Sequence, residues 1–430
     1  MPRPRPPSKI EPIATPCFGM HWYADPATGE SMIAYCGGGG AAATGVQNFF
    51  KVTQGGASLE VPTGNEVGVG IQIVQNPITG LRHVFVALGK ELHRYSLPDG
   101  ELTGKIECGD NLNCLNVNNM ADQVVVGCEN GTAIIYEMND EELFPDPVYV
   151  LEGHEKAVCG VAFAPRLQDR VLTSAKDGTA KVWQNGECLA SLVCDITDHN
   201  APPPARTPQV LVRGCAFGDL DGQVVYTIAS GRKGKAYLSH WEEIPPETDD
   251  PTQARRAYEL VMRTECSPCP ISAMSLSGDA SLLAMGSVDG TIILWSIEKW
   301  KALKRFPEVH DLPVTCIASR PYAIPLQGDE EEGIEFHAVS ASADSQLAFL
   351  TMQRRGPRKA GDGPSFSFLS TLKSAVKLIV LYYAFQPVAK EIQTKCTPEW
   401  NAKASQGYWP VLECIRDEGL WAPNAVSPPY

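Results

Sequence analysis

The chain has 430 residues, 43% hydrophobic and 20% charged, so it can bury a large core and has an ordinary globular composition. Its net charge of −14 argues against nucleic acid as a partner, because phosphate binding needs a basic surface. Most of the 14 cysteines stand within apolar runs, which indicates buried thiols in a reducing compartment. Residues 1–7 are rich in proline and arginine with no apolar segment after them, so no signal peptide is expected.

The first distinctive element is a glycine-rich loop over residues 36–48, with the sequence CGGGGAAATGVQN. Four consecutive glycines lose more backbone entropy on folding than any other tetrapeptide, so they indicate positive φ angles or a very close backbone contact. Strand-like segments at residues 31–35 and 46–52 flank the loop, which is therefore a hairpin tip and not a phosphate-binding strand-to-helix turn. A flexible surface loop without a function is the alternative.

The clearest repeat unit begins at Gly153-His154 and ends at Trp183. Its short runs of β-branched residues and its Asp-Gly turn are typical of a WD repeat, in which four strands make one propeller blade. We expect a buried hydrogen-bonded set in this unit, with a structural and not a catalytic role. Its members are His154, Ser174, Asp177 and Trp183.

Weaker copies of this unit recur along the chain with an aromatic residue near the end of each. These aromatic residues are Tyr95, Tyr136, Trp183, Trp241, Trp295 and Phe349. With an N-terminal unit that holds the glycine loop, they predict an all-β, seven-bladed WD-repeat β-propeller over residues 1–352. A lead strand within residues 10–23 is expected to pair with the seventh blade and close the ring. Inserted loops are expected at residues 200–208 and 327–333.

The composition changes beyond residue 352. Residues 353–365 form a basic linker with glycine and proline, and residues 366–389 are a candidate transmembrane or membrane-surface helix. Counted from Phe366 this helix reaches the ~20 residues that a bilayer span needs, although its uninterrupted apolar core, residues 378–385, is shorter. An amphipathic helix that docks on a partner or lies on the membrane is the alternative. Residues 390–430 are a tail without a pattern that predicts structure.

The glycine loop followed by Thr44-Gly45 and Asn48, at the start of a degenerate propeller, resembles the endoplasmic-reticulum guanine-nucleotide exchange factors of Sar-type small GTPases. Residues 213–217, 231–241 and 340–344 also match, and the resemblance covers residues 10–352. The glycine loop is the part of the resemblance that is specific to this family, since WD units occur in many unrelated propellers. Two departures are Ala43, where relatives often carry a polar or basic residue, and Gln386-Pro387, which interrupts the apolar helix.

This resemblance implies that the chain activates a Sar-type small GTPase by nucleotide exchange, which starts COPII coat assembly and involves no bond chemistry. It implies a propeller that faces the cytosol, held at the endoplasmic reticulum membrane through residues 366–389. The implied catalytic residues are Asn48, Gly45 and Thr44, and the implied GTPase-binding loop is Gly37, Gly38, Gly39, Gly40, Ala41 and Ala42. The implied cofactor is a potassium ion on the backbone carbonyls of Gly38, Gly39 and Gly40, with no organic cofactor. A soluble WD-repeat scaffold without exchange activity remains the alternative.

Overall fold

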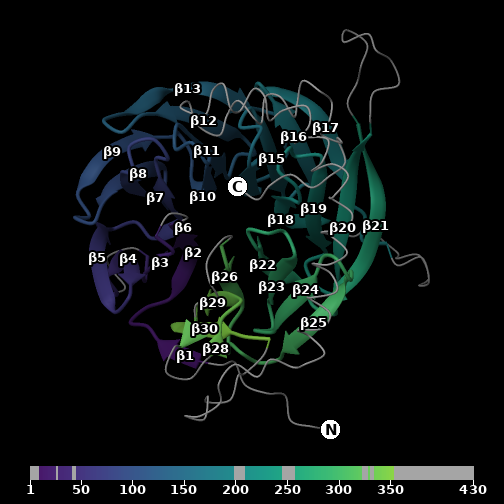
Figure 1. Ribbon diagram of the computed structural model, residues 1–430. Helices are drawn as coiled ribbons and strands as arrows, with labels where there is room; N and C mark the ends of the chain where they lie inside the picture. Colours follow the sequence, from purple (N-terminus) through teal and green to yellow (C-terminus); the bar gives the residue numbers. More distant parts are fainter. Residues whose placement is uncertain are drawn as a thin grey trace, which may run out of the picture. The chain divides into compact units, whose positions relative to one another are not determined.

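The computed structural model describes residues 9–25, 28–40, 45–197, 209–244, 257–321, 328–329 and 334–352. Within them the chain forms seven four-stranded antiparallel sheets around a central channel (Figure 1). The seven-bladed all-β propeller predicted from the repeats is therefore confirmed. The linker at 353–365, the candidate helix at 366–389 and the tail lie outside the described residues. Among the described residues, no helix has the length and apolar character needed to cross a membrane.

In blades one to six the four strands follow one another in sequence order from the channel outward. Blades one to three are β2 (Cys17–Ala24), β3 (Ser31–Gly37), β4 (Asn48–Gln54) and β5 (Ala57–Gly64); β6 (Gly68–Gln75), β7 (Arg82–Leu88), β8 (Glu91–Leu97) and β9 (Leu102–Glu107); and β10 (Leu112–Val117), β11 (Gln123–Cys128), β12 (Ala133–Met138) and β13 (Leu143–Leu151). Blades four to six are β14 (Val158–Phe163), β15 (Arg170–Ala175), β16 (Thr179–Gln184) and β17 (Glu187–Val193); β18 (Leu211–Phe217), β19 (Val224–Ser230), β20 (Ala236–Ile244) and β21 (Ala257–Ser267); and β22 (Ile271–Leu276), β23 (Leu282–Ser287), β24 (Ile292–Ser296) and β25 (Lys301–Phe306).

The seventh blade joins the two ends of the propeller. It contains β26 (Val314–Ser319), β29 (Ala338–Ser342), β30 (Gln346–Leu350) and, on its outer edge, β1 (Lys9–Pro12). The predicted lead strand over residues 10–23 is therefore only partly right. Lys9–Pro12 pairs with the last blade, but Cys17–Ala24 is the innermost strand of the first one. Prolines at positions 12 and 16 separate the two, because proline cannot donate to a ladder.

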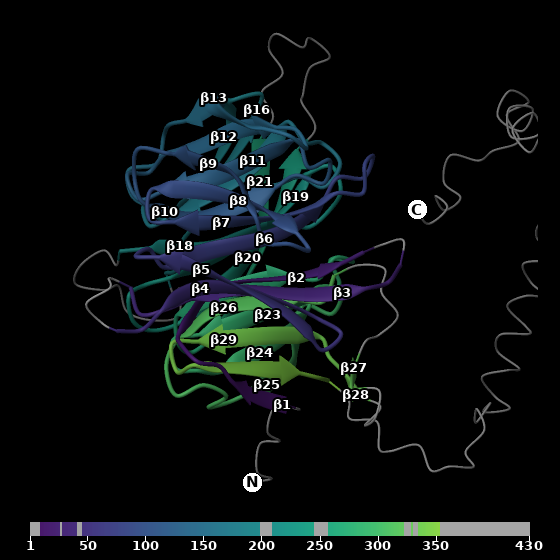
Figure 2. The ribbon, with the colours of Figure 1, turned by 90° about the vertical axis from the view of Figure 1, so that its left-hand side faces the viewer.

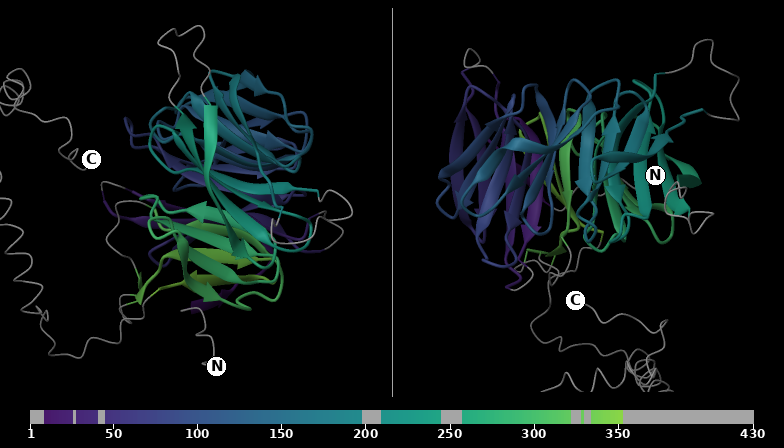
Figure 3. Two further views of the ribbon diagram at one scale, coloured as in Figure 1. Left: turned by 90° about the vertical axis from the view of Figure 1, so that its right-hand side faces the viewer. Right: turned by 90° about the horizontal axis from the view of Figure 1, so that it is seen from above.

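The strands run between the two faces of the ring (Figures 2 and 3). In each sheet the second strand packs against both neighbouring blades, so all six residues of β15 and of β23 are buried. The fourth strand lies at the rim, and β25 accordingly alternates exposed and half-buried residues. Of the two predicted inserted loops, only residues 328–329 are described, and these pair with residues 334–335 as the short hairpin β27 (Gly328–Asp329) and β28 (Ile334–Glu335).

The fourth blade contains the buried polar set expected from its sequence, with one different member. His154 Nδ1 lies 3.0 Å from Asp177 Oδ2. The hydroxyl is that of Thr173 and not that of Ser174: Thr173 Oγ1 lies 2.7 Å from His154 Nε2 and accepts from Trp183 Nε1 at 2.9 Å. Successive side chains of a strand point to opposite faces, so Ser174 faces away from this set, and its hydroxyl meets the thiol of Cys215 in the fifth blade.

The seventh blade repeats this set around His310, which lies 3.0 Å from Asp344 Oδ2 and 2.9 Å from Ser340 Oγ. The buried residue six positions after the aspartate is Leu350, as Trp183 is six positions after Asp177. Phe349, the aromatic residue expected near the end of this blade, therefore stands one residue before the position that Trp183 has in the fourth blade. Phe349 lies on the other face of the strand, where its ring centroid is 5.1 Å from that of Phe336.

Candidate functional site

The glycine loop connects the second and third strands of the first blade, where backbone contacts fix its base. Gly37 pairs with Phe49 in the ladder, and Gly38 N donates to Pro16 O at 3.0 Å. A Cβ on Gly37 would lie 1.9 Å from that same Pro16 oxygen. The close backbone contact that four glycines indicate is therefore the approach of the segment that enters the first blade.

Asn48 holds the other side of the loop base. Its side-chain amide donates to Gly40 O at 2.8 Å and to Gly64 O at 3.0 Å, and its Oδ1 accepts from Gly40 N at 3.0 Å. The residue is only 2% exposed. Both amide hydrogens and the oxygen are thus engaged within the first blade, so Asn48 positions the loop from inside.

Glycine conformations account for the remaining bends of the loop. Gly38 has φ +145°, Gly40 +82° and Gly45 +71°, all in the region that side chains disfavour. A Cβ on Gly38 would also lie 2.2 Å from Asn48 Oδ1, whereas one on Gly40 or Gly45 would meet nothing within 4 Å. Gly38 is therefore required by both contact and conformation, and Gly40 and Gly45 by conformation alone.

The described part of the loop divides into a buried base and an exposed limb. Gly37, Gly38 and Asn48 are buried, whereas Gly45, Val46 and Gln47 are exposed. Ala41, Ala42 and Thr44 lie outside the described residues. Sequence reasoning missed Pro16 and Gly64, whose carbonyls hold the loop, because the chain carries no signal for a carbonyl that approaches from another strand.

The glycine loop shares one face of the propeller with the other connections of its kind. The turn between the second and third strands of a blade lies beside the segment that leads into the first strand of the same blade or of the next one. Examples of these contacts are Leu112 N to Gly89 O at 2.7 Å and Lys176 N to Ala157 O at 3.0 Å. We call this side of the propeller the loop face.

The central channel has a volume of about 380 Å³ and is lined by first-strand residues of all seven blades. Three of its cysteines, Cys114, Cys159 and Cys215, have thiol pKa values raised mainly by burial, to about 12 for Cys215. Such thiols stay protonated and unreactive near neutral pH. Cys266 and Cys269, which have metal-ligand spacing, also belong to no metal-binding group, because the described residues contain no cluster of three His, Cys, Asp or Glu that could hold a metal ion.

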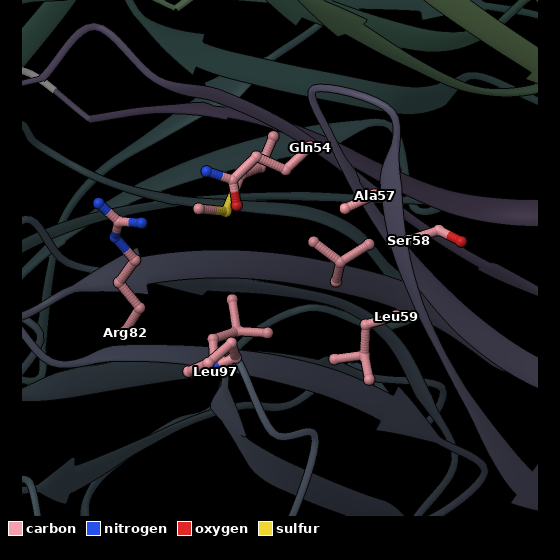
Figure 4. Close-up of a pocket in the computed structure, with 9 residues that line it drawn as sticks. Gln54, Ala57, Ser58, Leu59, Arg82 and Leu97 are labelled. Carbon is pink, nitrogen blue, oxygen red and sulfur yellow. The ribbon is translucent and has the colours of Figure 1, made fainter.

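An apolar groove of about 390 Å³ lies at the opposite ends of β3 and β4 from the glycine loop. Figure 4 shows Arg82 at one side of it and Ser58 and Leu59 at the other. The Arg82 guanidinium is already paired with the carboxylates of Asp25 and Glu30. The groove is therefore separate from the glycine loop, with its one lining cation neutralised.

Comparison with protein families finds "WD domain, G-beta repeat" (WD40) at residues 145–184 and 259–296. These residues correspond to β13 through β16 and to β21 through β24, so each WD40 repeat comprises the outer strand of one blade and the first three strands of the next, the fourth and the sixth. The propeller is accordingly a WD40-repeat propeller.

Several curated proteins are similar to this chain over part of their length. Periodic tryptophan protein 2 of Saccharomyces cerevisiae is 26% identical over 52% of this chain and 25% of its own length. Guanine nucleotide-exchange factor SEC12 of Rattus norvegicus is 23% identical over 49% of each chain, and that of Mus musculus agrees in these values. WD repeat-containing protein 18 of Bos taurus is 23% identical over 46% of this chain and 43% of its own length. The chain thus spans about half or less of these relatives.

Proposed function

We propose that this chain is a guanine-nucleotide exchange factor for a Sar-type small GTPase. The observation that carries the proposal is the glycine loop, whose base on the loop face is fixed by Asn48 and Pro16. A scaffold surface does not need four glycines held in place by a buried asparagine. The similarity to the SEC12 exchange factors of rat and mouse supports the same function.

The proposed mechanism is differential binding, without bond chemistry. A small GTPase holds its nucleotide through ordered switch segments, and a partner releases it by binding the nucleotide-free form more tightly. In this proposal the limb from Gly45 to Gln47, which is exposed, contacts the GTPase. Asn48 acts as a positioning residue, because the hydrogen bonds of its side-chain amide keep the base of the loop in place while the limb contacts the GTPase.

A potassium ion on the loop forms part of the proposal. Backbone carbonyls of Gly38, Gly39 and Gly40 would hold it, and glycine allows such carbonyls to converge because no Cβ intervenes. The Gly40 oxygen already accepts one hydrogen bond from Asn48, which leaves one lone pair for a cation. The Thr15 hydroxyl, buried without a partner among the described residues, lies next to Pro16 in the chain and offers another oxygen. The ion would stiffen the loop.

We further propose that the protein acts at the endoplasmic reticulum membrane, where residues 366–389 attach it and the propeller faces the cytosol. Product GTPase would then start COPII coat assembly at that membrane. This placement rests on the family resemblance and on the apolar character of residues 366–389, which lie outside the described residues.

A WD-repeat scaffold without exchange activity is the second candidate. The observation in its favour is that five of the seven similar proteins carry no exchange-factor name, among them Striatin-4 of Mus musculus, which is 22% identical over 40% of this chain. In a scaffold the glycine loop would be one surface connection among fourteen on the loop face.

The deciding experiment measures release of a fluorescent GDP analogue from a purified Sar-type GTPase on addition of the whole chain. We expect strong acceleration, greater in potassium than in sodium buffer. Asn48→Ala should abolish acceleration without unfolding the propeller, because it removes three hydrogen bonds from the loop base. Asn130→Ala, in the equivalent turn of the third blade, is the matched control and should exchange normally.

Each result separates the candidates. No acceleration from a folded native chain would leave the scaffold as the better account. Acceleration that is equal in both cations would keep the exchange function and remove the ion. Full activity of Asn48→Ala would show that the clamp at the loop base has no part in exchange.

A further inference from the structure

The inner strands of all seven blades share a bulge near their start, at the second residue in six of them and at the third residue, Arg213, in β18. The ladder register shifts at this bulge in every blade, which leaves one unpaired residue there. These residues are Phe18, Val69, Asn113, Cys159, Arg213, Ser272 and Thr315, and all seven line the channel. A bulge re-aims a side chain, and here it points each one into the channel near the loop face. Arg213 alone among them is charged.

Arg213 also breaks the bonding pattern of the bulge position. Asn113 donates to Val158 O at 3.2 Å and Ser272 donates to Val314 O at 2.6 Å, so each ties its blade to the next. Arg213 makes no such bond with any described residue, and its Nε is buried without a partner. Arg170 Nε is also buried without an acceptor, but Arg170 is paired with Glu243, whereas Arg213 has no ion pair with a described residue, so both its Nε and its charge are left without a partner there.

Other cations continue from Arg213 across blades four and five of the loop face. Lys176 lines the same channel, and both it and Arg213 oppose the rise in the Cys159 pKa that burial causes, which places all three close together. Lys156 adjoins Lys176 through the bond from Lys176 N to Ala157 O. We call the following residues the basic rim: Lys156, Lys176, Arg213, Arg232 and Lys233.

None of the basic rim residues forms an ion pair with another described residue. The neighbouring cations Lys235 and Arg263 do, with Glu265 and Asp195. Three carboxylates stand near the rim in the sequence: Asp177, which is hydrogen-bonded to His154, and the exposed Glu152 and Glu155. None of the three forms an ion pair with a rim cation among the described residues. The rim is therefore a local excess of positive charge on a chain whose net charge is −14.

We infer that the basic rim is a binding site for an acidic polypeptide segment of a partner protein, with one carboxylate entering the channel to meet Arg213. A guanidinium binds a carboxylate through two parallel N–H donors, which supplies the acceptor that Arg213 Nε lacks. A channel of about 380 Å³ admits a side chain. The exposed Lys156, Arg232 and Lys233 then meet flanking carboxylates. A nucleic acid fits less well, because an extended chain of phosphates requires a larger basic surface than these five cations provide.

This site does not depend on exchange activity and is tested without a GTPase. The probe is a fluorescein-labelled octaglutamate peptide, titrated with the whole chain and followed by anisotropy. We expect binding at low salt that weakens steeply as salt is raised. The double variant Lys176→Gln/Arg213→Gln should bind about tenfold more weakly or worse, because it removes charge-assisted hydrogen bonds. Lys299→Gln/Lys301→Gln, which removes equal charge from exposed positions of blade six, should bind like the native chain.

The assay also separates the other ligands that a cationic site attracts. No binding of octaglutamate at low salt, or equal weakening in both double variants, would overturn the inference. The inference would also be overturned if inorganic phosphate or phosphatidylserine vesicles displaced the labelled peptide at concentrations at which unlabelled octaglutamate does not displace it. Should substitution of Arg213 prevent folding, Arg232→Gln/Lys233→Gln on the exposed turn of blade five carries the same test, with the same expected weakening.

Discussion

At the scale of single residues, the polar set of the fourth blade shows how one hydroxyl organises a buried site. Thr173 Oγ1 meets both His154 Nε2 and Trp183 Nε1, so it joins the entry segment of the blade to its third strand. His154 in turn engages Asp177 in the hairpin. Burial alone would raise the pKa of Asp177, but hydrogen bonds from His154 and Thr179 outweigh it and hold that pKa well below its usual range.

Thr173 and its neighbour Ser174 provide a matched test of this set. Thr173→Val keeps the shape of the side chain but leaves a histidine nitrogen and an indole N–H buried without partners, so we expect a loss of about 2 kcal/mol or more of unfolding free energy. Ser174→Ala removes only a weak hydrogen bond with the Cys215 thiol, and should cost much less than Thr173→Val. Urea unfolding followed by tryptophan fluorescence measures both. Equal losses in the two variants would show that Thr173 is not the organising hydroxyl.

The sequence could identify this set but not its register. All six residues of β15 are buried, because the strand packs against a blade on each side. The alternation of apolar and polar residues that normally reveals the two faces of a strand is therefore missing. In the seventh blade Leu350, and not Phe349, occupies the position that Trp183 has in the fourth, and Phe349 is half-buried on the other face of β30.

At the scale of elements, the rhythm of strands and turns predicted seven blades correctly, because short strands with Asp-Gly turns are local features. The glycine loop was also predicted from composition alone. The inward orientation of Asn48 was not, since it depends on the carbonyl of Gly64 at the far end of β5. The unpaired Arg213 was missed likewise, because a bulge appears only when two strands are aligned.

The strand β1 gives the element-scale prediction. Its four residues cover the edge of β30, with Lys9 opposite Phe349 and Pro12 opposite Gln346. A chain that begins at residue 13 should lose about 2–4 kcal/mol of stability, at about 1 kcal/mol for each backbone hydrogen bond. It should also self-associate through the exposed edge of β30. A chain that begins at Lys9 keeps β1 and is the control. Calorimetry and light scattering that find the two chains alike would mean that β1 does not hold the ring closed.

At the scale of the whole molecule, burial of histidines between and within blades makes stability depend on pH. His21 in the first blade accepts a hydrogen bond from Ile73 N of the second at 3.2 Å, so its ring is neutral there, and burial lowers its pKa to about 4. Burial also lowers the pKa values of His83, His240 and His310. In the folded state the uncharged form of each of these four histidines is therefore favoured, and protonating any of them destabilises the fold.

The sign of the pH dependence follows from proton uptake. Below the unfolded-state pKa of about 6.5 the unfolded chain binds protons that the folded chain does not, so stability is complete above that pH and falls as the solution is acidified. For His21 the loss is spread over the interval from about 6.5 to about 4 and amounts to at most about 3 kcal/mol. The carboxylates with lowered pKa values, such as Asp177, add their loss mainly at the acidic end, from about pH 5 downward.

Urea unfolding at a series of pH values between neutral and mildly acidic conditions measures this slope. His21→Asn keeps an acceptor for Ile73 N but cannot take up the proton, so its stability should fall less steeply with acidification than that of the native chain. The difference in slope, and not the stability at neutral pH, is the readout, because the substitution also changes packing. Parallel slopes would mean that His21 titrates alike in the folded and unfolded states. The contact between the first two blades would then be insensitive to acid, and the slope would arise from the other three histidines.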